Sequence, residues 1–359
     1  MMVKVSNMGT NEFGQRLKTE KIVCICAGRR LKILCEAYPL LQERISYVVD
    51  NYCHGKSIVV GSREMPILSM QEIGENIREA TVVITSLRYA GEIIRQMDNM
   101  DVCDGLEVFI PDLFHPDKDG VELKSGHKQM IPKVINYCWF GGGDIPEKFQ
   151  KNIESWRRVC PEYEIVRWDE SNYDYKKNRY MLQAYEAKKW GFVPDFARLD
   201  IINAYGGIYL DVDVELLKPF DDFLEFDLFC GFENPWFVAL GLGFGGIAQN
   251  PILQEMMELY EEIAFIRADG ELDLTASPVY QTEVLARHGL IRNGCSQEHD
   301  GFAVFAPEFF APINAYGYGN ITQKTCSIHQ YAATWFGDEH KEFKERVRES
   351  IRFLMGRGI

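Results

Sequence analysis

Short runs of β-branched and aliphatic residues alternate with amphipathic helical segments over the N-terminal third of the chain. Strand patterns lie at 21–26, 45–49, 81–85 and 106–110, with helical spacing of apolar residues between several of them. Strands that alternate with helices are typical of an α/β unit built on a parallel sheet. We therefore predict an α/β fold.

The alternation begins again at Ile131, after a polar stretch that contains Gly and Pro. A stretch of this composition is typical of a linker. We expect the chain to divide into a tail over 1–18, a Rossmann-like domain over 19–118, a linker over 119–130, a second α/β domain over 131–338 and a C-terminal amphipathic helix over 339–359.

The first unit carries a weak phosphate-binding signal. A dinucleotide fold would show Gly-x-Gly-x-x-Gly after its first strand, but the turn here holds only Gly28. Asp50 lies where an acid that binds ribose would lie. A nucleotide-binding domain and a scaffold both stay open, and the missing glycines favour the scaffold.

Charge and hydropathy limit the partners. The chain has 39 Lys and Arg against 53 Asp and Glu, a formal net charge of -14. Nucleic-acid binding usually needs a basic face, so we expect no nucleic-acid partner. The first twenty residues show no apolar run of a signal peptide, and no stretch is long enough to span a membrane. We therefore expect a cytoplasmic protein.

The segment from 341 to 357 predicts an amphipathic helix whose apolar residues share one face. Its other side carries several basic residues. Docking on the protein core is one interpretation. The other is a basic helix that rests on the inner face of the membrane.

Two acids, Asp211 and Asp213, follow a buried apolar run. On an extended strand side chains alternate between faces, so these two carboxylates would share the face opposite the core. Such a pair can bind a hard divalent cation through oxygen, and we predict Mn²⁺ or Mg²⁺ as the cofactor. Asp117 and Asp119 have the same spacing, but they lie in a hydrophilic stretch where a solvated turn is expected.

Three more residues are candidates for the same site. Asp195 and Arg198 are three positions apart on a predicted helix and share a face. They are either a surface ion pair, which would be worth little, or a pair that reaches the cleft beside Asp211. His329 is either a structural histidine or a third ligand for the cation.

Taken together, these segments resemble glycosyltransferase family 32, the DXD-containing sugar transferases of capsule and lipo-oligosaccharide synthesis. The resemblance runs in order from about residue 131 to 336 and rests on the segments 131–142, 155–170, 184–190, 195–198, 206–220 and 329–335. It implies a GT-A-type nucleotide-sugar-binding domain and a retaining reaction. It does not extend to the N-terminal unit.

The resemblance implies roles for residues around the nucleotide. Trp139 would stack on the donor base, which an indole can do. Phe140, Gly141 and Gly142 would line the nucleotide, with the glycines letting the backbone approach it. Trp335 would lie near the diphosphate.

It also implies roles at the sugar and the metal. Asp195 and Arg198 would hold the donor sugar, Asp211 would contact ribose and metal, and Asp213 and His329 would bind the metal.

The function that we predict is transfer of a hexose from a nucleotide-sugar to a saccharide or lipid-linked acceptor in surface polysaccharide synthesis. We expect a UDP-sugar rather than a GDP-sugar. Two alternatives stay open. One is a regulatory protein that binds a nucleotide-sugar without turnover. The other is a glycoside hydrolase, whose two carboxylates would lie at least about 5 Å apart across a sugar.

Overall fold

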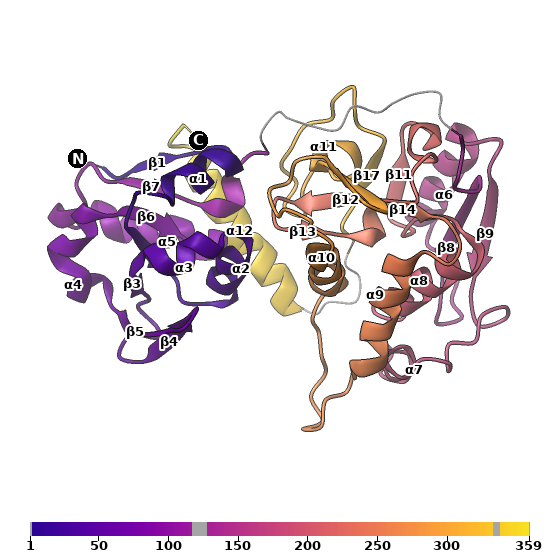
Figure 1. Ribbon diagram of the computed structural model, residues 1–359, viewed down its shortest axis with the longest axis horizontal. Coiled ribbons are helices and arrows are strands. Elements are labelled where there is room, and N and C mark those ends of the chain that lie inside the picture. Colours follow the sequence, from indigo (N-terminus) through magenta and orange to yellow (C-terminus); the bar gives the residue numbers. More distant parts are fainter. Residues whose placement is uncertain (1, 117–127, 333–337, 359) are drawn as a thin grey trace. The chain divides into compact units, whose positions relative to one another are not determined.

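The computed structural model describes residues 2–116, 128–332 and 338–358. The chain forms two compact units (Figure 1). Unit 1 comprises Met1–Asp117 and Phe336–Ile359, and unit 2 comprises Lys118–Trp335. Each unit combines a sheet with helices, so the α/β prediction is confirmed. The linker expected at 119–130 falls largely outside the described residues.

Unit 1 contains one sheet with the strand order β1-β7-β6-β2-β3-β5-β4. All neighbouring strands are parallel except β4 and β5. The strands are β1 (Lys4–Ser6), β2 (Ile22–Ile25), β3 (Ile45–Val49), β4 (Ser57–Val60), β5 (Arg63–Leu68), β6 (Thr81–Ile84) and β7 (Glu107–Phe109). Every residue of β2 is buried, as expected for a parallel strand that is covered on both faces.

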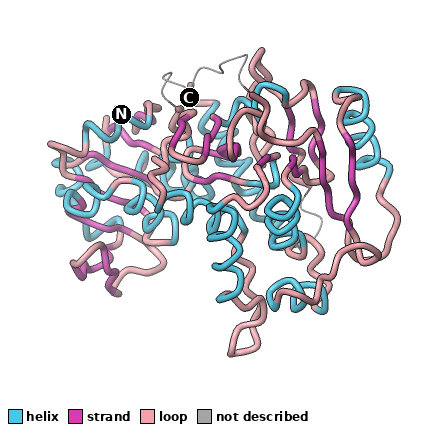
Figure 2. Tube along the Cα trace, turned by 45° about the vertical axis from the view of Figure 1, so that its right-hand side comes forward, coloured by secondary structure: helices cyan, strands magenta, loops and turns pink. Residues whose placement is uncertain are grey.

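Six α-helices are described in unit 1, and Figure 2 shows them alongside the strands. They are α1 (Thr10–Arg16), α2 (Arg29–Ala37), α3 (Pro39–Arg44), α4 (Met70–Ile73), α5 (Leu87–Asp98) and α12 (Asp338–Met355). Short 3-10 helices are η1 (Gly74–Glu79), η2 (Asp101–Cys103) and η3 (Pro111–Leu113).

The expectation of a tail over 1–18 is wrong. β1 adds to the sheet beside β7, and Phe13 of α1 is fully buried. A three-residue strand is too short to show a period-2 pattern, so it left no clear signal in the sequence.

Asp50 follows β3, and its carboxylate accepts hydrogen bonds from nearby backbone N–H groups. One carboxylate oxygen accepts the N–H of Ala27 at 3.0 Å, and the other accepts the N–H groups of Tyr52 at 2.9 Å and Cys53 at 3.2 Å. An acid that organises two turns in this way favours the scaffold interpretation of unit 1.

The C-terminal helix α12 packs along α5 within unit 1. Its apolar residues Val347, Ile351 and Leu354 are buried, and the Ser350 hydroxyl donates to the carbonyl of Arg88 at 3.0 Å. Ion pairs such as Arg346–Glu342 and Arg352–Glu345 connect basic and acidic residues along its outer side. The apolar face is therefore used for docking, and contact with a membrane stays a prediction.

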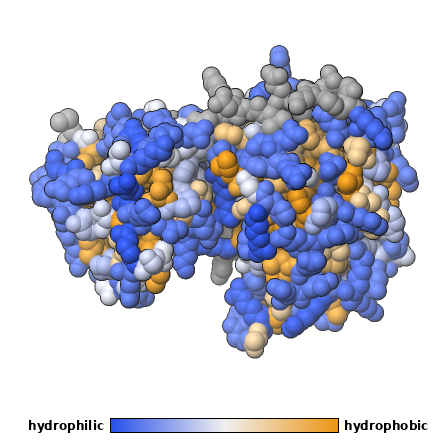
Figure 3. All heavy atoms as spheres, in the orientation of Figure 1, coloured by the Kyte–Doolittle hydropathy of each residue, from blue (hydrophilic) through white to orange (hydrophobic). Residues whose placement is uncertain are grey.

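Among the described residues, no helix has both the length and the apolar character needed to cross a bilayer. On the face drawn in Figure 3, most of the surface of each unit is hydrophilic and the apolar side chains form separate patches.

Unit 2 is built on a mixed sheet with the order β15-β16-β12-β14-β10-β8-β9, in which β13 also pairs with β12. β11 and β17 form a separate antiparallel pair. The strands are β8 (Val134–Cys138), β9 (Glu164–Trp168), β10 (Gly207–Tyr209), β11 (Val214–Leu216), β12 (Leu228–Asn234), β13 (Phe237–Val238), β14 (Phe244–Gly246), β15 (Gln297–His299), β16 (Phe302–Phe305) and β17 (Ser327–His329).

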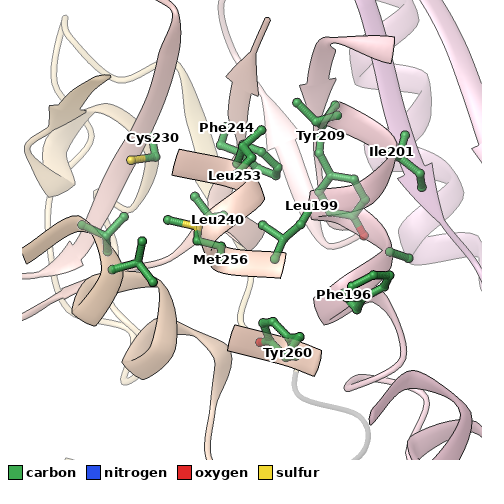
Figure 4. Close-up of a cluster of buried hydrophobic side chains, with 14 of the residues drawn as sticks. Phe196, Leu199, Ile201, Tyr209, Cys230, Leu240, Phe244, Leu253, Met256 and Tyr260 are labelled. Carbon is green, nitrogen blue, oxygen red and sulfur yellow. The ribbon is translucent and has the colours of Figure 1, made fainter. Parts of the chain in front are cut away.

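The helices of unit 2 bury both faces of this sheet. They are α6 (Glu147–Val159), α7 (Arg179–Glu186), α8 (Pro194–Tyr205), α9 (Pro251–Glu262), α10 (Ser277–Arg287) and α11 (Pro307–Phe310), with 3-10 helices η4 (Asp221–Phe223) and η5 (Leu240–Leu242). Along β10, Tyr209 belongs to one apolar cluster and Ile208 to another. Because strand side chains alternate, the two clusters cover opposite faces. Figure 4 shows the first, formed by α8, η5, β14 and α9 around Tyr209.

Docking of α12 predicts a clear difference between two neighbouring residues. Leu354 is 1% exposed and Met355 is 55% exposed. Leu354→Ala should lower the free energy of unfolding by about 2–5 kcal/mol because it leaves a cavity in the core, whereas Met355→Ala should change it by less than about 0.5 kcal/mol. Urea unfolding followed by circular dichroism measures both. Equal effects would mean that α12 is not docked in solution.

Candidate functional site

The two acids of the Asp-x-Asp motif lie at the carboxyl end of β10. This strand pairs in parallel with β8, so its end shares an edge of the sheet with the end of β8. Ligand sites in α/β sheets form at that edge. The position predicted for Asp211 and Asp213 therefore corresponds to a normal ligand-binding location.

The local conformation differs from the predicted strand. β10 ends at Tyr209, and the chain then turns so that the Val214 N–H donates to the Asp211 carbonyl at 3.0 Å. The apolar residues alternate through the turn, and this period-2 pattern predicted a strand. The two acids face a common point because of the turn, not because of strand alternation.

Two side chains of helix α6 stabilise this turn by hydrogen bonds to its backbone carbonyls. The Asn152 amide donates to the Val212 carbonyl at 2.9 Å, and the indole N–H of Trp156 donates to the Val214 carbonyl at 2.8 Å. Trp156 is fully buried. The backbone carbonyls around Asp213 are therefore fixed by side chains from a packed helix.

Strand β17 brings His329 to the same turn, because Val214 of β11 is its partner in the antiparallel pair. His329 Nε2 lies 3.1 Å from Asp213 Oδ1, and the other carboxylate oxygen accepts the Ala332 N–H at 2.9 Å. His329 Nδ1 is buried and has no hydrogen-bond partner among the residues that the structure describes.

Asp211, Asp213 and His329 form a group that could hold a metal ion. Each offers one ligand atom, and these atoms lie within 4.8 Å of one another. Two carboxylate oxygens and an imidazole nitrogen suit a divalent cation such as Mn²⁺. The residues present therefore fit the predicted cofactor.

Beside this group lies a buried ion pair on α8. Arg198 Nη2 is 3.1 Å from Asp195 Oδ1 and 3.4 Å from Asp211 Oδ1. Asp195 and Arg198 are each 4% exposed, which excludes the surface ion pair. The guanidinium also lies over the ring of Tyr209 at 5.3 Å, and its Nε donates to the Pro194 carbonyl at 3.2 Å.

Burial and neighbouring charge set the protonation of the acids. Burial raises the pKa of Asp195 to about 6, against the opposing effect of Arg198. Burial also raises the pKa of Asp211, again opposed by Arg198. Burial would do the same at Asp213, but His329 and the Ala332 N–H outweigh it and hold the pKa at about 2. Two of the acids thus flank the guanidinium and the third pairs with His329, and a bound cation would offset the excess negative charge.

Gly241 is a site residue that sequence reasoning missed. A Cβ atom at this position would collide with Asp211 Oδ2 and lie 3.2 Å from Arg198 Nη1. The Gly241 carbonyl also accepts the N–H of Asp211 at 3.3 Å. The only signal in the sequence is the run Leu-Gly-Leu-Gly at 240–243, which has no motif spacing of its own.

The expected nucleotide loop follows β8. Gly141 and Gly142 have positive φ angles of 98° and 69°, which glycine adopts without strain. The Gly141 N–H donates to Glu170 at 2.6 Å, and the indole N–H of Trp139 donates to the Gly143 carbonyl at 2.7 Å.

Two further residues were predicted to line the nucleotide, Phe140 and Trp335. Phe140 is buried in the core, with its ring 6.0 Å from that of Tyr173. Trp335 lies outside the described residues. The contacts expected between both residues and a nucleotide stay predictions.

The close approach of Gly241 to Asp211 gives a stability prediction. Gly241→Ala should lower the free energy of unfolding by about 1–3 kcal/mol, because the added methyl group overpacks the site. Gly143→Ala is the matched control, since a Cβ atom there meets nothing within 4 Å. Thermal unfolding compares the two variants. Equal midpoints would show that Asp211 is free to move away from η5.

Comparison with known proteins gives a family match for part of unit 2. Residues 146–230 match the model described as the glycosyltransferase sugar-binding region containing a DXD motif. Inositol phosphoceramide mannosyltransferase 1 of Schizosaccharomyces pombe is 29% identical over 132 residues, which are 32% of this chain and 40% of that protein.

Mannosyl phosphorylinositol ceramide synthase SUR1 of Saccharomyces cerevisiae is 28% identical over 134 residues, which are 36% of this chain and 35% of that protein. This chain thus spans less than half the length of the curated relatives that it matches. A solved structure, the PaToxG glycosyltransferase, aligns with a TM-score of 0.37 at 21% identity, over 44% of this chain and 68% of that one.

The region of the family match includes Asp195, Arg198, Asp211 and Asp213. The predicted resemblance is confirmed: the chain carries the sugar-binding region of the DXD-containing glycosyltransferases.

Proposed function

We propose that unit 2 transfers a hexosyl group from a nucleotide-sugar to an acceptor hydroxyl. The observation that carries this proposal is the cluster of Asp211, Asp213 and His329 beside the buried Asp195–Arg198 pair. A cation site next to a rigid guanidinium and carboxylate can bind the two halves of a nucleotide-sugar, the diphosphate and the sugar.

Asp211, Asp213 and His329 would hold Mn²⁺ or Mg²⁺. When bound, the cation would supply Lewis-acid stabilisation for negative charge on the departing nucleotide diphosphate. Asp213 is the most firmly held of these ligands, because the Ala332 N–H donates to one of its carboxylate oxygens while the other oxygen faces His329. Burial opposes protonation of His329, but Asp213 raises its pKa, so binding of a cation would displace a proton.

Asp195 and Arg198 would position the donor sugar. Arg198 is held by two carboxylates, a backbone carbonyl and an aromatic face, so few of its rotamers remain. A guanidinium has five N–H donors, and a carboxylate accepts hydrogen bonds from sugar hydroxyls. Groups fixed in advance lower the barrier by orientation and by electrostatic preorganisation.

Trp139, Gly141 and Gly142 would take the nucleoside. A Cβ atom at Gly142 would meet nothing within 4 Å, so a nucleotide can approach the backbone there, whereas the Trp190 ring lies against Gly141. The hydrogen bond from Trp139 to Gly143 fixes the edge of the indole and leaves its face for stacking on a base.

The proposal also covers the stereochemistry of the reaction, the donor and the acceptor. We propose a retaining reaction, with a UDP-sugar as donor and a GDP-sugar as the alternative. The two fungal relatives are named for mannosyl transfer and for inositol phosphoceramide. These names support a hexose and a lipid-linked acceptor, with a saccharide acceptor as the other choice and surface polysaccharide as the product.

Donor hydrolysis without acceptor tests the proposal. Purified protein is incubated with a panel of UDP- and GDP-sugars, with Mn²⁺ or with EDTA, and nucleotide release is measured. One donor should be hydrolysed, and EDTA should abolish the release. Asp213→Asn should reduce it by about 100-fold or more, because it removes a charged ligand of the cation.

Asp222→Asn provides the control, because Asp222 is an exposed acid of η4 in the same unit. It should keep wild-type turnover. Turnover that survives both EDTA and Asp213→Asn would contradict the proposal. Nucleotide binding without turnover on any donor would favour the regulatory alternative.

A further inference from the structure

Gln281 on α10 has a buried amide nitrogen without a partner. The residue is 0% exposed, its Oε1 accepts the Leu240 N–H at 3.0 Å, and its Nε2 has no hydrogen-bond partner among the residues that the structure describes. The Leu240 N–H fixes the orientation of the amide, since a flipped amide would bring two donors together. A buried donor without a partner is unfavourable and needs an explanation.

The surroundings of Gln281 belong to the sugar end of the proposed site. Ser277 lies one turn earlier on the same face of α10, and its side chain is among the groups that lower the pKa of Asp195. On the other side, Leu240 precedes Gly241, which lies against Asp211 and Arg198. Gln281 thus lies one helical turn from a residue that acts on Asp195, and its partner Leu240 adjoins a residue that lies against Arg198.

Tyr260 of α9 is a second buried group of this kind. It is 1% exposed, and its hydroxyl has no hydrogen-bond partner among the described side chains and backbone. Its ring lies edge-on to Tyr180 at 5.0 Å, and the Tyr180 hydroxyl reaches Asp195 at 3.5 Å. Leu240 and Tyr260 both appear in Figure 4. Two unpartnered polar groups thus lie on α10 and on α9, and α9 packs against α8, the helix that carries Asp195.

We propose that Gln281 donates a hydrogen bond from Nε2 to a hydroxyl of the donor sugar and so determines which sugar is accepted. This inference rests on the proposed function. The amide carries no charge, so it suits a hydroxyl better than a phosphate, which is bound best by charged groups. Asp195, Arg198 and Gln281 are all buried within unit 2, with exposed fractions of 4%, 4% and 0%.

The position of α10 is rigid enough for this role. The Thr282 hydroxyl accepts the Val238 N–H at 2.9 Å and donates to the Pro278 carbonyl at 2.6 Å. Gln281 is thus fixed both by its own bond to Leu240 and by the bond of its neighbour to β13. A site built to hydrogen-bond a hydroxyl rejects an analogue that lacks it, because the buried polar group is then left unpaired.

The test combines Gln281→Met with donor analogues that each lack one sugar hydroxyl. Wild-type protein should lose about 10-fold or more in kcat/KM for one deoxy position. In Gln281→Met, kcat/KM for the complete donor should fall by a similar factor. The kcat/KM of this variant for that one deoxy donor should be no lower than its kcat/KM for the complete donor. Glu283→Gln, on the exposed side of α10, should behave as wild type.

Two further measurements separate the outcomes. Affinity of Gln281→Met for the free nucleoside diphosphate with Mn²⁺ should stay at the wild-type value, which excludes misfolding. If Gln281→Met still distinguishes the complete donor from each deoxy donor by the wild-type factor, the inference is overturned and the proposed function is left intact. Absence of donor binding and turnover in wild-type protein would instead overturn both.

Discussion

The Arg198 guanidinium, held between Asp195 and Asp211, is the interaction on which the proposed site depends. Its two carboxylate partners come from different elements. Asp195 lies on α8 together with Arg198, and Asp211 follows β10. Removing any one of the three would leave a buried charge without its partner, which is strongly unfavourable. These three groups therefore constrain how α8 can pack on the sheet, and Asp211 connects the guanidinium to the cluster that it forms with Asp213 and His329.

The environment of the acids explains why the site suits a cation. Asp195, Asp211 and Asp213 outnumber the one guanidinium, and all three lie in or next to the core. His329 offsets part of the excess when it is protonated. A divalent cation would offset more, and the ligand atoms are already close together. The fold thus places an excess of negative charge at the edge of the sheet where nucleotides bind in α/β proteins.

Much of this could be predicted from the sequence, because the signals were local. The alternation of strand and helix patterns predicted the α/β class, and the three-residue spacing of Asp195 and Arg198 predicted that they share a face. The conformation at Asp211–Asp213 could not be predicted, because the period-2 pattern of apolar residues continues through a turn. The strand β1 is too short for a pattern, and the amphipathic α12 was compatible with either docking or a membrane.

Gly241 and Gln281 show a different limit. Their importance depends on contacts between segments far apart in the chain, and neither has a spacing that points to a site. Gly241 is identified only by the space that a Cβ atom would need beside Asp211, and Gln281 only by an amide nitrogen that lacks a partner. The same holds for Asp50 in unit 1, whose carboxylate proves to be bonded to backbone N–H groups.

Calorimetric titration of the wild-type protein with UDP and with GDP, in the presence and absence of Mn²⁺, tests the central claim most directly. The account predicts that one of the nucleotides binds at least about 10-fold more tightly when Mn²⁺ is present, since the diphosphate and the acid cluster share the cation. Binding of equal affinity with and without Mn²⁺, or no binding of either nucleotide, would contradict the assignment of Asp211, Asp213 and His329 to a cation that carries the donor.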